Sequence, residues 1–435
     1  MKKLLSITAL SLTLTAPAAM AYSPAHPSGQ NLTFGHISFN QNLSGLLNNP
    51  AAGATRLNKR GGGFGFGLLT SAGFSMELGD VPLLADRATE LGNLMNNFTG
   101  NVDAANAAKN QIEAILAEMG SQPYLFNLSA SAHAPGSPLY IALKGLGSLV
   151  VDVNVSAASK LAFLDGPVSI VMSGTEFLPS SDASMYIKAA TVLEGSVAYS
   201  RPIINLGFGH LYGGARLNLY GVGLAKTLLP AVLASQMQSL VNDELTKPRQ
   251  AKTGWGADFG MMLVGSNYRA GVTLKNAISP SFAYDAIGVG CASLSGAAQD
   301  SCYLAQYHAD KIALEEVHVM NPQFKTEGTL FSANETWFVA GSLDLNPVHD
   351  VIANPVQMVG VSAGYASRSI FLPGIRAGVH KNLVGTGLTY ASVGLSLFKV
   401  LNVDAALGLD QLQLSASAPG IPRKLAINVG LEIAF

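Results

Sequence analysis

Charged side chains are scarce in this chain of 435 residues. Asp, Glu, Lys and Arg together make up 12% of it, against about 25% in ordinary soluble domains. A soluble protein of this size needs charge to cover its surface, so the composition argues against a soluble globular fold. The 26 basic and 27 acidic side chains nearly cancel. A nucleic-acid-binding protein would carry a basic excess, so nucleic acid is not expected as a partner.

Long hydrophobic runs are also missing. After residue 21 no stretch of about 18 uncharged apolar residues occurs, although a membrane-spanning helix requires that length. Yet apolar residues make up 49% of the chain, and its mean hydropathy is +0.30. A closed β-barrel resolves this conflict, because it spreads its lipid-facing surface over alternate residues of many strands.

Cysteine is limited to Cys291 and Cys302. Two cysteines this close together in an exported protein are expected to pair, and a disulfide here would stiffen a short loop. The alternative is a redox role, which lacks the support of a low-pKa dithiol motif around the two residues.

Motifs for catalysis and for metal or nucleotide binding were sought and are absent from the sequence. It contains no Gly-x-Ser-x-Gly elbow, no His-Glu-x-x-His and no Walker loop. The eight histidines are scattered. We therefore expect a protein that is not an enzyme and that has no catalytic residues, no metal site and no cofactor.

The N-terminus has the features of a secretory signal peptide. Lys2 and Lys3 precede an apolar stretch over residues 4–15, and Ala19-Met20-Ala21 supplies a small-x-small cleavage site. Such a segment is removed on export and is too short to anchor the protein. We expect residues 1–21 to be cleaved.

The C-terminal segment alternates between an apolar face and a small or polar face. This is the period of a strand that has lipid on one side, whereas a soluble β-sandwich strand is the alternative. A chain that ends on an aromatic residue in this pattern resembles outer-membrane barrels. The apolar face holds Leu425, Ile427, Val429, Leu431, Ile433 and Phe435, and the other face holds Ala426, Asn428, Gly430, Glu432 and Ala434.

Similar alternation recurs along the chain in segments long enough to cross a bilayer at about ten residues each. An even number of strands is expected of a bacterial barrel, so we predict one all-β antiparallel transmembrane barrel of about 14 strands. The candidate strands are residues 62–76, 123–133, 139–155, 160–175, 183–199, 203–222, 254–266, 268–277, 311–320, 325–346, 357–366, 370–384, 387–400, 401–412 and 423–435. The polar side chains expected to face the lumen are Arg216, Asp258, Asp344, Arg376, His380 and Asp404.

Two segments break the β pattern. Residues 81–119 place Leu91, Leu94 and later Ile112 at helical spacing, and residues 225–246 do the same with Leu228 and Leu229. We expect two helical inserts outside the strands, as long loops or as caps over a mouth. Simple packing against the barrel end and a role as a gate or apolar binding surface both remain open.

The sequence Asn49-Pro50-Ala51-Ala52 precedes a first Gly-rich strand and resembles the N-terminal hatch of FadL-like outer-membrane proteins. That superfamily includes long-chain fatty-acid and hydrocarbon channels. The resemblance implies that residues 22–60 form a hatch inside a barrel made by residues 61–435. Pro50 disfavours a helix at Asn49, while Ala51 and Ala52 are small enough to pack closely against a wall. An ordinary Asn-Pro turn is the alternative.

Over nearly all of its mature length the chain is similar to the barrel-type family named TraF conjugal-transfer protein, found in Gram-negative bacteria. It lacks the Cys-x-x-Cys of the thioredoxin-like proteins that share this name. The resemblance implies an outer-membrane location, with membrane lipid as a partner. Two functions are open: a passive channel for hydrophobic or amphipathic small molecules, or a structural or assembly component of a conjugation or secretion machine that binds other envelope proteins.

Overall fold

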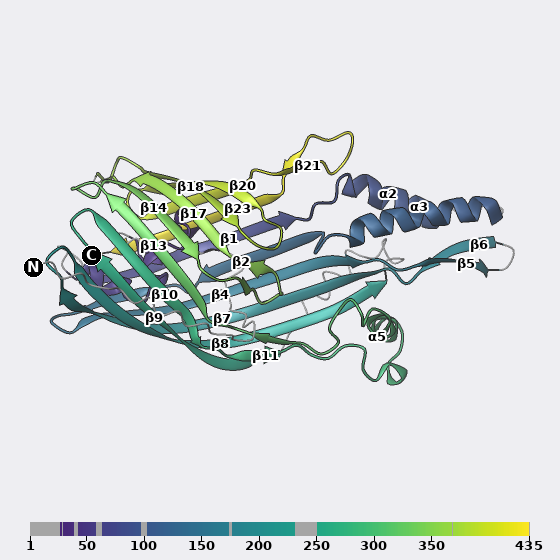
Figure 1. Ribbon diagram of the computed structural model, residues 1–435, viewed down its shortest axis with the longest axis horizontal. Coiled ribbons are helices and arrows are strands. Elements are labelled where there is room, and N and C mark those ends of the chain that lie inside the picture. Colours follow the sequence, from purple (N-terminus) through teal and green to yellow (C-terminus); the bar gives the residue numbers. More distant parts are fainter. Residues whose placement is uncertain are drawn as a thin grey trace, which may run out of the picture.

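Antiparallel strands form a closed barrel wall in the computed structural model, which describes residues 27, 29–38, 42–57, 63–96, 102–173, 176–230, 250–367 and 369–434 (Figure 1). Each wall strand pairs with its neighbours in the chain, and the first also pairs with the last, which closes the wall. The signal peptide predicted for residues 1–21 and the terminal Phe435 lie outside the described residues.

The wall has fourteen strand positions, so the prediction of a 14-stranded barrel is confirmed. The strands are β1 (Phe64–Leu78), β2 (Phe126–His133), β4 (Gly147–Leu164), β7 (Ser184–Asn205), β8 (His210–Pro230), β9 (Lys252–Val264), β10 (Tyr268–Ile278), β13 (Gln323–Phe331), β14 (Trp337–Asp344), β17 (Met358–Tyr365), β18 (Gly374–Asn382), β19 (Thr389–Leu397), β20 (Leu401–Gly408) and β23 (Lys424–Ala434).

One strand position is interrupted. The strand β3 (Leu139–Leu143) continues the line of β2 after a break, and both pair with β1 and β4. Hydrogen bonds across the break hold the wall together: the Gly67 N–H donates to the Pro138 carbonyl (3.1 Å), and the Ala134 N–H donates to the Val153 carbonyl (2.9 Å). The wall is therefore hydrogen-bonded on both sides of this position.

The two faces of the wall differ in polarity, as the alternation predicts. In β18, Ile375 and Val379 are exposed on the outside while Arg376 and His380 are buried. The same outward apolar pattern recurs around the barrel. Its exposed members include Leu217, Leu219, Trp255, Phe259, Val272, Phe324, Leu330, Trp337, Val339, Val361, Val393, Leu407, Leu425 and Ile427.

The two ends of the barrel are unlike one another. At one end, which also holds the C-terminus, short connections join the strands (Figure 1); we call it the turn end. At the other, the loop end, the connections are long. β4, β7 and β8 also rise farther toward the loop end, with 18, 22 and 21 residues, whereas about ten suffice to cross a bilayer.

A helical hairpin and a β-hairpin project from the loop end (Figure 1). The helices α2 (Leu84–Asn96) and α3 (Val102–Gly120) confirm the helical insert predicted near residues 81–119. Ile112 and Leu116 of α3 are fully buried against the extended part of β4 and β7. The hairpin of β5 (Val168–Ser173) and β6 (Glu176–Ser181) lies beside α3. Among the described residues, no helix combines the length and apolar character that crossing a membrane requires.

Further excursions cover part of the loop end. One runs through β11 (Ser281–Ala283), the short helix η4 (Cys291–Ser293), α5 (Ala297–Tyr307) and β12 (Val317–Val319). Cys291 and Cys302 form a disulfide within it, as predicted. Shorter β pairs follow as β15 (Val348–His349) with β16 (Pro355–Val356), and β21 (Gln411–Leu412) with β22 (Ile421–Pro422).

The helix predicted near residues 225–246 is wrong over its first part, because residues 225–230 continue β8; residues 231–246 lie outside the described part of the chain. Leu228 lies on the same face of β8 as the inward-facing Arg216 and Lys226, and it packs there against α5, whereas Leu229 on the opposite face packs toward α3. A strand that is covered on both faces is apolar throughout, so it loses the alternation that identifies it.

Candidate functional site

A short chain segment lies inside the barrel. We call residues 27, 29–38 and 42–57 the luminal segment; it contains α1 (Asn31–Phe34) and the 3₁₀ turns η1 (Ser44–Leu47) and η2 (Ala52–Arg56). Most of its residues are buried. Ala51, Ala52 and Ala54 pack against Tyr140 and Met262 of the wall, within an apolar cluster that also holds Leu43 and Leu46.

Three wall carboxylates accept hydrogen bonds from the luminal segment. The Thr33 hydroxyl donates to Asp404 (2.5 Å), and the Leu43 N–H donates to Glu432 (2.7 Å). The Ser38 hydroxyl donates to Glu327 (2.7 Å), and the Ser38 N–H donates to the same carboxylate. These carboxylates sit on three different strands, β20, β23 and β13. Hydrogen bonds to a charged acceptor are stronger than neutral ones, so they hold the segment at separate points of the wall.

Glycines in the wall let the luminal segment approach closely. A Cβ at Gly378 would lie 2.3 Å from the Thr33 carbonyl oxygen, and a Cβ at Gly260 would lie 2.0 Å from Asn49 Oδ1. Neither distance is compatible with a side chain. The Asn49 amide in turn donates to the Met261 carbonyl (3.2 Å) and to the Val272 carbonyl (3.1 Å). The segment therefore fits a cavity that the wall leaves open for it.

The four residues of the predicted hatch motif, Asn49, Pro50, Ala51 and Ala52, all lie in this luminal segment. Asn49 contacts the wall as described, and its Oδ1 accepts a hydrogen bond from the Ala51 N–H (2.9 Å). Ala51 and Ala52 are completely buried. The motif thus makes a tight turn and at the same time packs against the barrel wall.

The six polar residues expected to face the lumen are all buried inside the barrel. The structure brings Arg376 and Asp404 together in an ion pair of 2.5 Å, and it places Arg216 at 3.6 Å from Asp258. Asp344 pairs instead with Lys325 (3.2 Å). His380 donates from Nε2 to the Thr33 carbonyl of the luminal segment (3.0 Å).

Sequence reasoning did not single out several residues of this interior. Glu327 and Lys325 of β13 share the inward face of one strand, and Glu432 lies on the polar face of β23. Glu77 and Lys160 also line the lumen. The alternation of each strand contains the signal that would find these residues, once the position of the strand is known.

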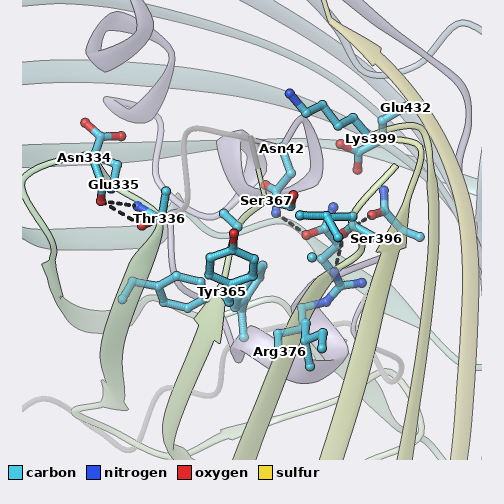
Figure 2. Close-up of a pocket in the computed structure, with 18 of the residues that line it drawn as sticks. Asn42, Asn334, Glu335, Thr336, Tyr365, Ser367, Arg376, Ser396, Lys399 and Glu432 are labelled. Atoms are coloured by element: carbon cyan, nitrogen blue, oxygen red, sulfur yellow. Dashed lines mark hydrogen bonds between the residues drawn. The ribbon is translucent and has the colours of Figure 1, made fainter. Parts of the chain in front are cut away.

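A cavity of about 580 Å³ lies on the turn-end side of the luminal segment (Figure 2). We call it the turn-end chamber. In Figure 2, Asn334 and Glu335 stand on the side opposite Lys399 and Glu432, with Tyr365 and Ser367 between them. Gln30, Phe34 and Asn42 of the luminal segment line the same cavity. The chamber is thus bounded by the wall, by the turns and by the luminal segment itself.

Arg376 lies at the boundary of the turn-end chamber but has its guanidinium committed to protein partners. Its Nε and Nη2 donate to the two oxygens of Asp404 (2.7 and 2.5 Å), and its Nη1 donates to the Ser396 hydroxyl (2.6 Å). The Phe34 ring packs 5.6 Å from the guanidinium carbon. The Arg376–Asp404 pair therefore positions the luminal segment rather than offering a free cation to a ligand.

A second cavity, of about 270 Å³, lies on the loop-end side of the luminal segment. This loop-end chamber is lined by His36 of the luminal segment, by Lys160, Glu77 and Lys424 of the wall, and by the connections over residues 350–358 and 382–388. The luminal segment therefore lies between two chambers, one at each end of the lumen. Within the described residues, no group of three His, Cys, Asp or Glu side chains is placed to hold a metal ion.

A family model described as "F plasmid transfer operon, TraF, protein" matches residues 46–344, which is more than half of the chain. No protein among the curated sequences matches this chain.

Among solved structures, the TodX deltaS2S3 mutant monoaromatic hydrocarbon channel has 12% identity and a TM-score of 0.49, and the match covers 94% of this chain and 99% of that one. A Pseudomonas aeruginosa FadL homologue has 12% identity and a TM-score of 0.40, with coverage of 95% and 99%. The P. putida toluene transporter TodX has 12% identity and a TM-score of 0.38, with coverage of 96% and 99%. Similarity at this level does not indicate what this chain binds.

Proposed function

This chain belongs to the family of the F plasmid transfer operon TraF protein, and from that premise we propose that it is a passive outer-membrane channel for small amphipathic molecules, with the luminal segment as its gate. The closed wall, the outward apolar face and the inward charges support a barrel that sits in a bilayer. A predicted signal peptide and a barrel fold together favour the outer membrane, with its lipid around the wall.

The arrangement of the two chambers carries this proposal. The turn-end chamber and the loop-end chamber lie on opposite sides of the luminal segment, inside one closed wall. A path through the barrel is therefore interrupted by a single piece of chain. Because that piece is held by hydrogen bonds and small-residue packing, it can shift without opening the wall.

The lining of both chambers favours amphipathic solutes over purely hydrophobic ones. The turn-end chamber combines Phe34, Phe338 and Tyr365 with Asn42 and Ser396. Asn42 and Ser396 are hydrogen-bonded to protein groups, so a hydrocarbon would not strand them, but it would match only the aromatic part of the lining. A solute with one polar end and one apolar end matches both parts of the lining. We propose no catalytic role for any of these residues.

A structural or assembly role in a conjugation or secretion machine is the second candidate. It is favoured by the family, whose description names a plasmid transfer operon, and by the α2–α3 and β5–β6 hairpins that project from the loop end (Figure 1). Projections of this kind offer a surface to other envelope proteins.

Uptake and mating assays on the same strains separate the two candidates. We expect a strain that lacks the protein to take up a small amphipathic solute such as benzamide more slowly, at unchanged mating frequency, and the full-length protein to restore uptake. A loss of mating at unchanged uptake would instead support the assembly role and exclude the channel.

A further inference from the structure

The loop-end chamber contains an ammonium group that the described residues leave without a partner. Lys160 lies on β4, lines this chamber, and forms no hydrogen bond or ion pair with any side chain or carbonyl in the described part of the chain. Asn127, its register partner on β2, lines the chamber too. The Lys160 ammonium therefore faces the cavity itself.

The carboxylates near Lys160 are already occupied by other donors. Asp350 accepts hydrogen bonds from the Ile352 N–H (3.0 Å), the Asn354 N–H (2.8 Å) and the Asn354 amide (3.1 Å). Glu77 accepts from Lys424 (3.3 Å), and from the Tyr124 and Thr386 hydroxyls. Both carboxylates therefore have hydrogen-bond donors other than Lys160, although Asp350 is near enough to attract the Lys160 ammonium.

The charged side chains in and next to the loop-end chamber include four lysines and three buried or half-buried carboxylates. Around and above the chamber stand the lysines 160, 188, 226 and 424 and the carboxylates of Glu77, Glu316 and Asp350. Lys188 and Lys226 both pair with Glu316 (2.5 and 3.8 Å), and Lys424 pairs with Glu77. The extra positive charge belongs to Lys188 and Lys226, which share Glu316. Of the four lysines, Lys160 is the one with no direct ion pair in the described part of the chain. A partly buried cation without a counterion is unfavourable, and an anion in the cavity would relieve it.

We propose that the loop-end chamber binds a small organic anion, a carboxylate or a similar acid, whose negative group pairs with Lys160. This inference rests on the proposed channel function and names a class of solute for it. Val356, Met358 and Leu388 line the chamber as well, so the rest of the molecule is apolar. A volume of about 270 Å³ admits an acid of the size of benzoate and is too small for a long chain.

The test compares benzoate with benzamide, a neutral molecule of the same shape, by titration calorimetry on the full-length protein in a non-ionic detergent. We expect benzoate to bind at least about tenfold more tightly than benzamide, because a hydrogen bond to a charged group contributes more than a neutral one. The substitution Lys160→Met should abolish this preference, whereas Lys160→Arg should keep it. The matched control is Lys381→Met, because Lys381 is exposed on the outside of β18.

Equal affinity for the two ligands, or a preference that persists in Lys160→Met, would overturn the anion site. The difference in gel mobility between unboiled and boiled protein shows whether each variant has a folded barrel. If Lys160→Met does not fold, Lys160→Arg still tests the proposal. The uptake of benzamide by cells tests the proposed channel function separately. Uptake without a Lys160-dependent preference for benzoate disproves only the site. Lys160-dependent binding of benzoate without any uptake disproves only the channel.

Discussion

Single wall residues determine how the luminal segment is held. Asp404 lies between Arg376 and Thr33 and accepts hydrogen bonds from both. A buried ion pair gains little net stability because its desolvation offsets the attraction, but it fixes the geometry of its members. Arg376 thus orients the carboxylate that binds the luminal segment. Next to it, Gly378 provides the space into which the Thr33 carbonyl fits.

The substitution Gly378→Ala should loosen the luminal segment without opening the wall. Its new methyl group would meet the Thr33 carbonyl oxygen at 2.3 Å, and overpacking of this kind costs about 1–3 kcal/mol. We expect higher conductance in planar bilayers and faster cleavage of the segment by protease. Gly328→Ala is the matched control, because a Cβ there meets nothing within 4 Å. Identical conductance in the two variants would contradict a gating role.

For single residues, the sequence predicts which face of the wall a side chain occupies but not which residue it pairs with. Alternation alone places residues such as Arg376 and Asp404 on the inward face, because successive side chains of a strand point to opposite sides. It could not show that Asp344 pairs with Lys325, or that Glu327 binds the luminal segment. Those contacts depend on strand register and on the position of a segment that is remote in the sequence.

Among the elements, the projecting parts of the barrel are held by packing rather than by the wall ladder. α3 buries Ile112, Ile115 and Leu116 against the extended ends of β4 and β7. Through this contact the outer faces of those strand ends are shielded from water. The helical hairpin is thus an accessory layer whose stability can change independently of the wall.

The substitution Ile112→Ala should release the helical hairpin while the barrel stays intact. Removing most of a fully buried isoleucine side chain costs about 2–5 kcal/mol, and the loss falls on the α3 contact. We expect faster proteolysis within residues 84–120 and an unchanged gel-mobility shift on boiling. Ala114→Ser, at an exposed position of α3, serves as the control. A variant that loses the shift would show that α3 supports the wall itself.

The elements that sequence analysis missed share one physical cause. Residues 325–346 were expected as one strand but form β13 and β14, because the connection over residues 332–336 is short and polar side chains support its turn. Of residues 311–320, only Val317–Val319 is a strand. It pairs with β11 in a separate two-stranded sheet that is not part of the wall. The expected count of 14 strands still holds, because some candidate segments divide into two strands while others join into one. Alternation reports the polarity of a face and carries no information about where the chain turns.

For the whole molecule, the wall and the luminal segment are separable. The hydrogen-bonded ladder closes through β1 and β23 without using any residue of the luminal segment. The segment contributes contacts inside the lumen, where water can replace polar partners such as Glu327 and Glu432. The hydrogen-bonded wall is therefore complete without any residue of the segment.

Deletion of residues 27–57 should leave a folded barrel with a wider path. We expect the mobility shift on boiling to persist, because the wall ladder is complete without these residues, and we expect single-channel conductance to rise several-fold as the two chambers join. Planar-bilayer recording against the full-length protein measures this. An unchanged conductance would mean that another part of the protein closes the lumen.

The seam between β1 and β23 also sets an order of events in time. β1 must wait for its second neighbour until the last strand has been synthesised, since nearly the whole chain lies between them. Three of the groups that hold the luminal segment are similarly late, because Asp404, Asn428 and Glu432 belong to β20 and β23. Pairings between such distant residues form slowly. The last contacts of the luminal segment and the closure of the wall therefore both depend on the final strands of the chain.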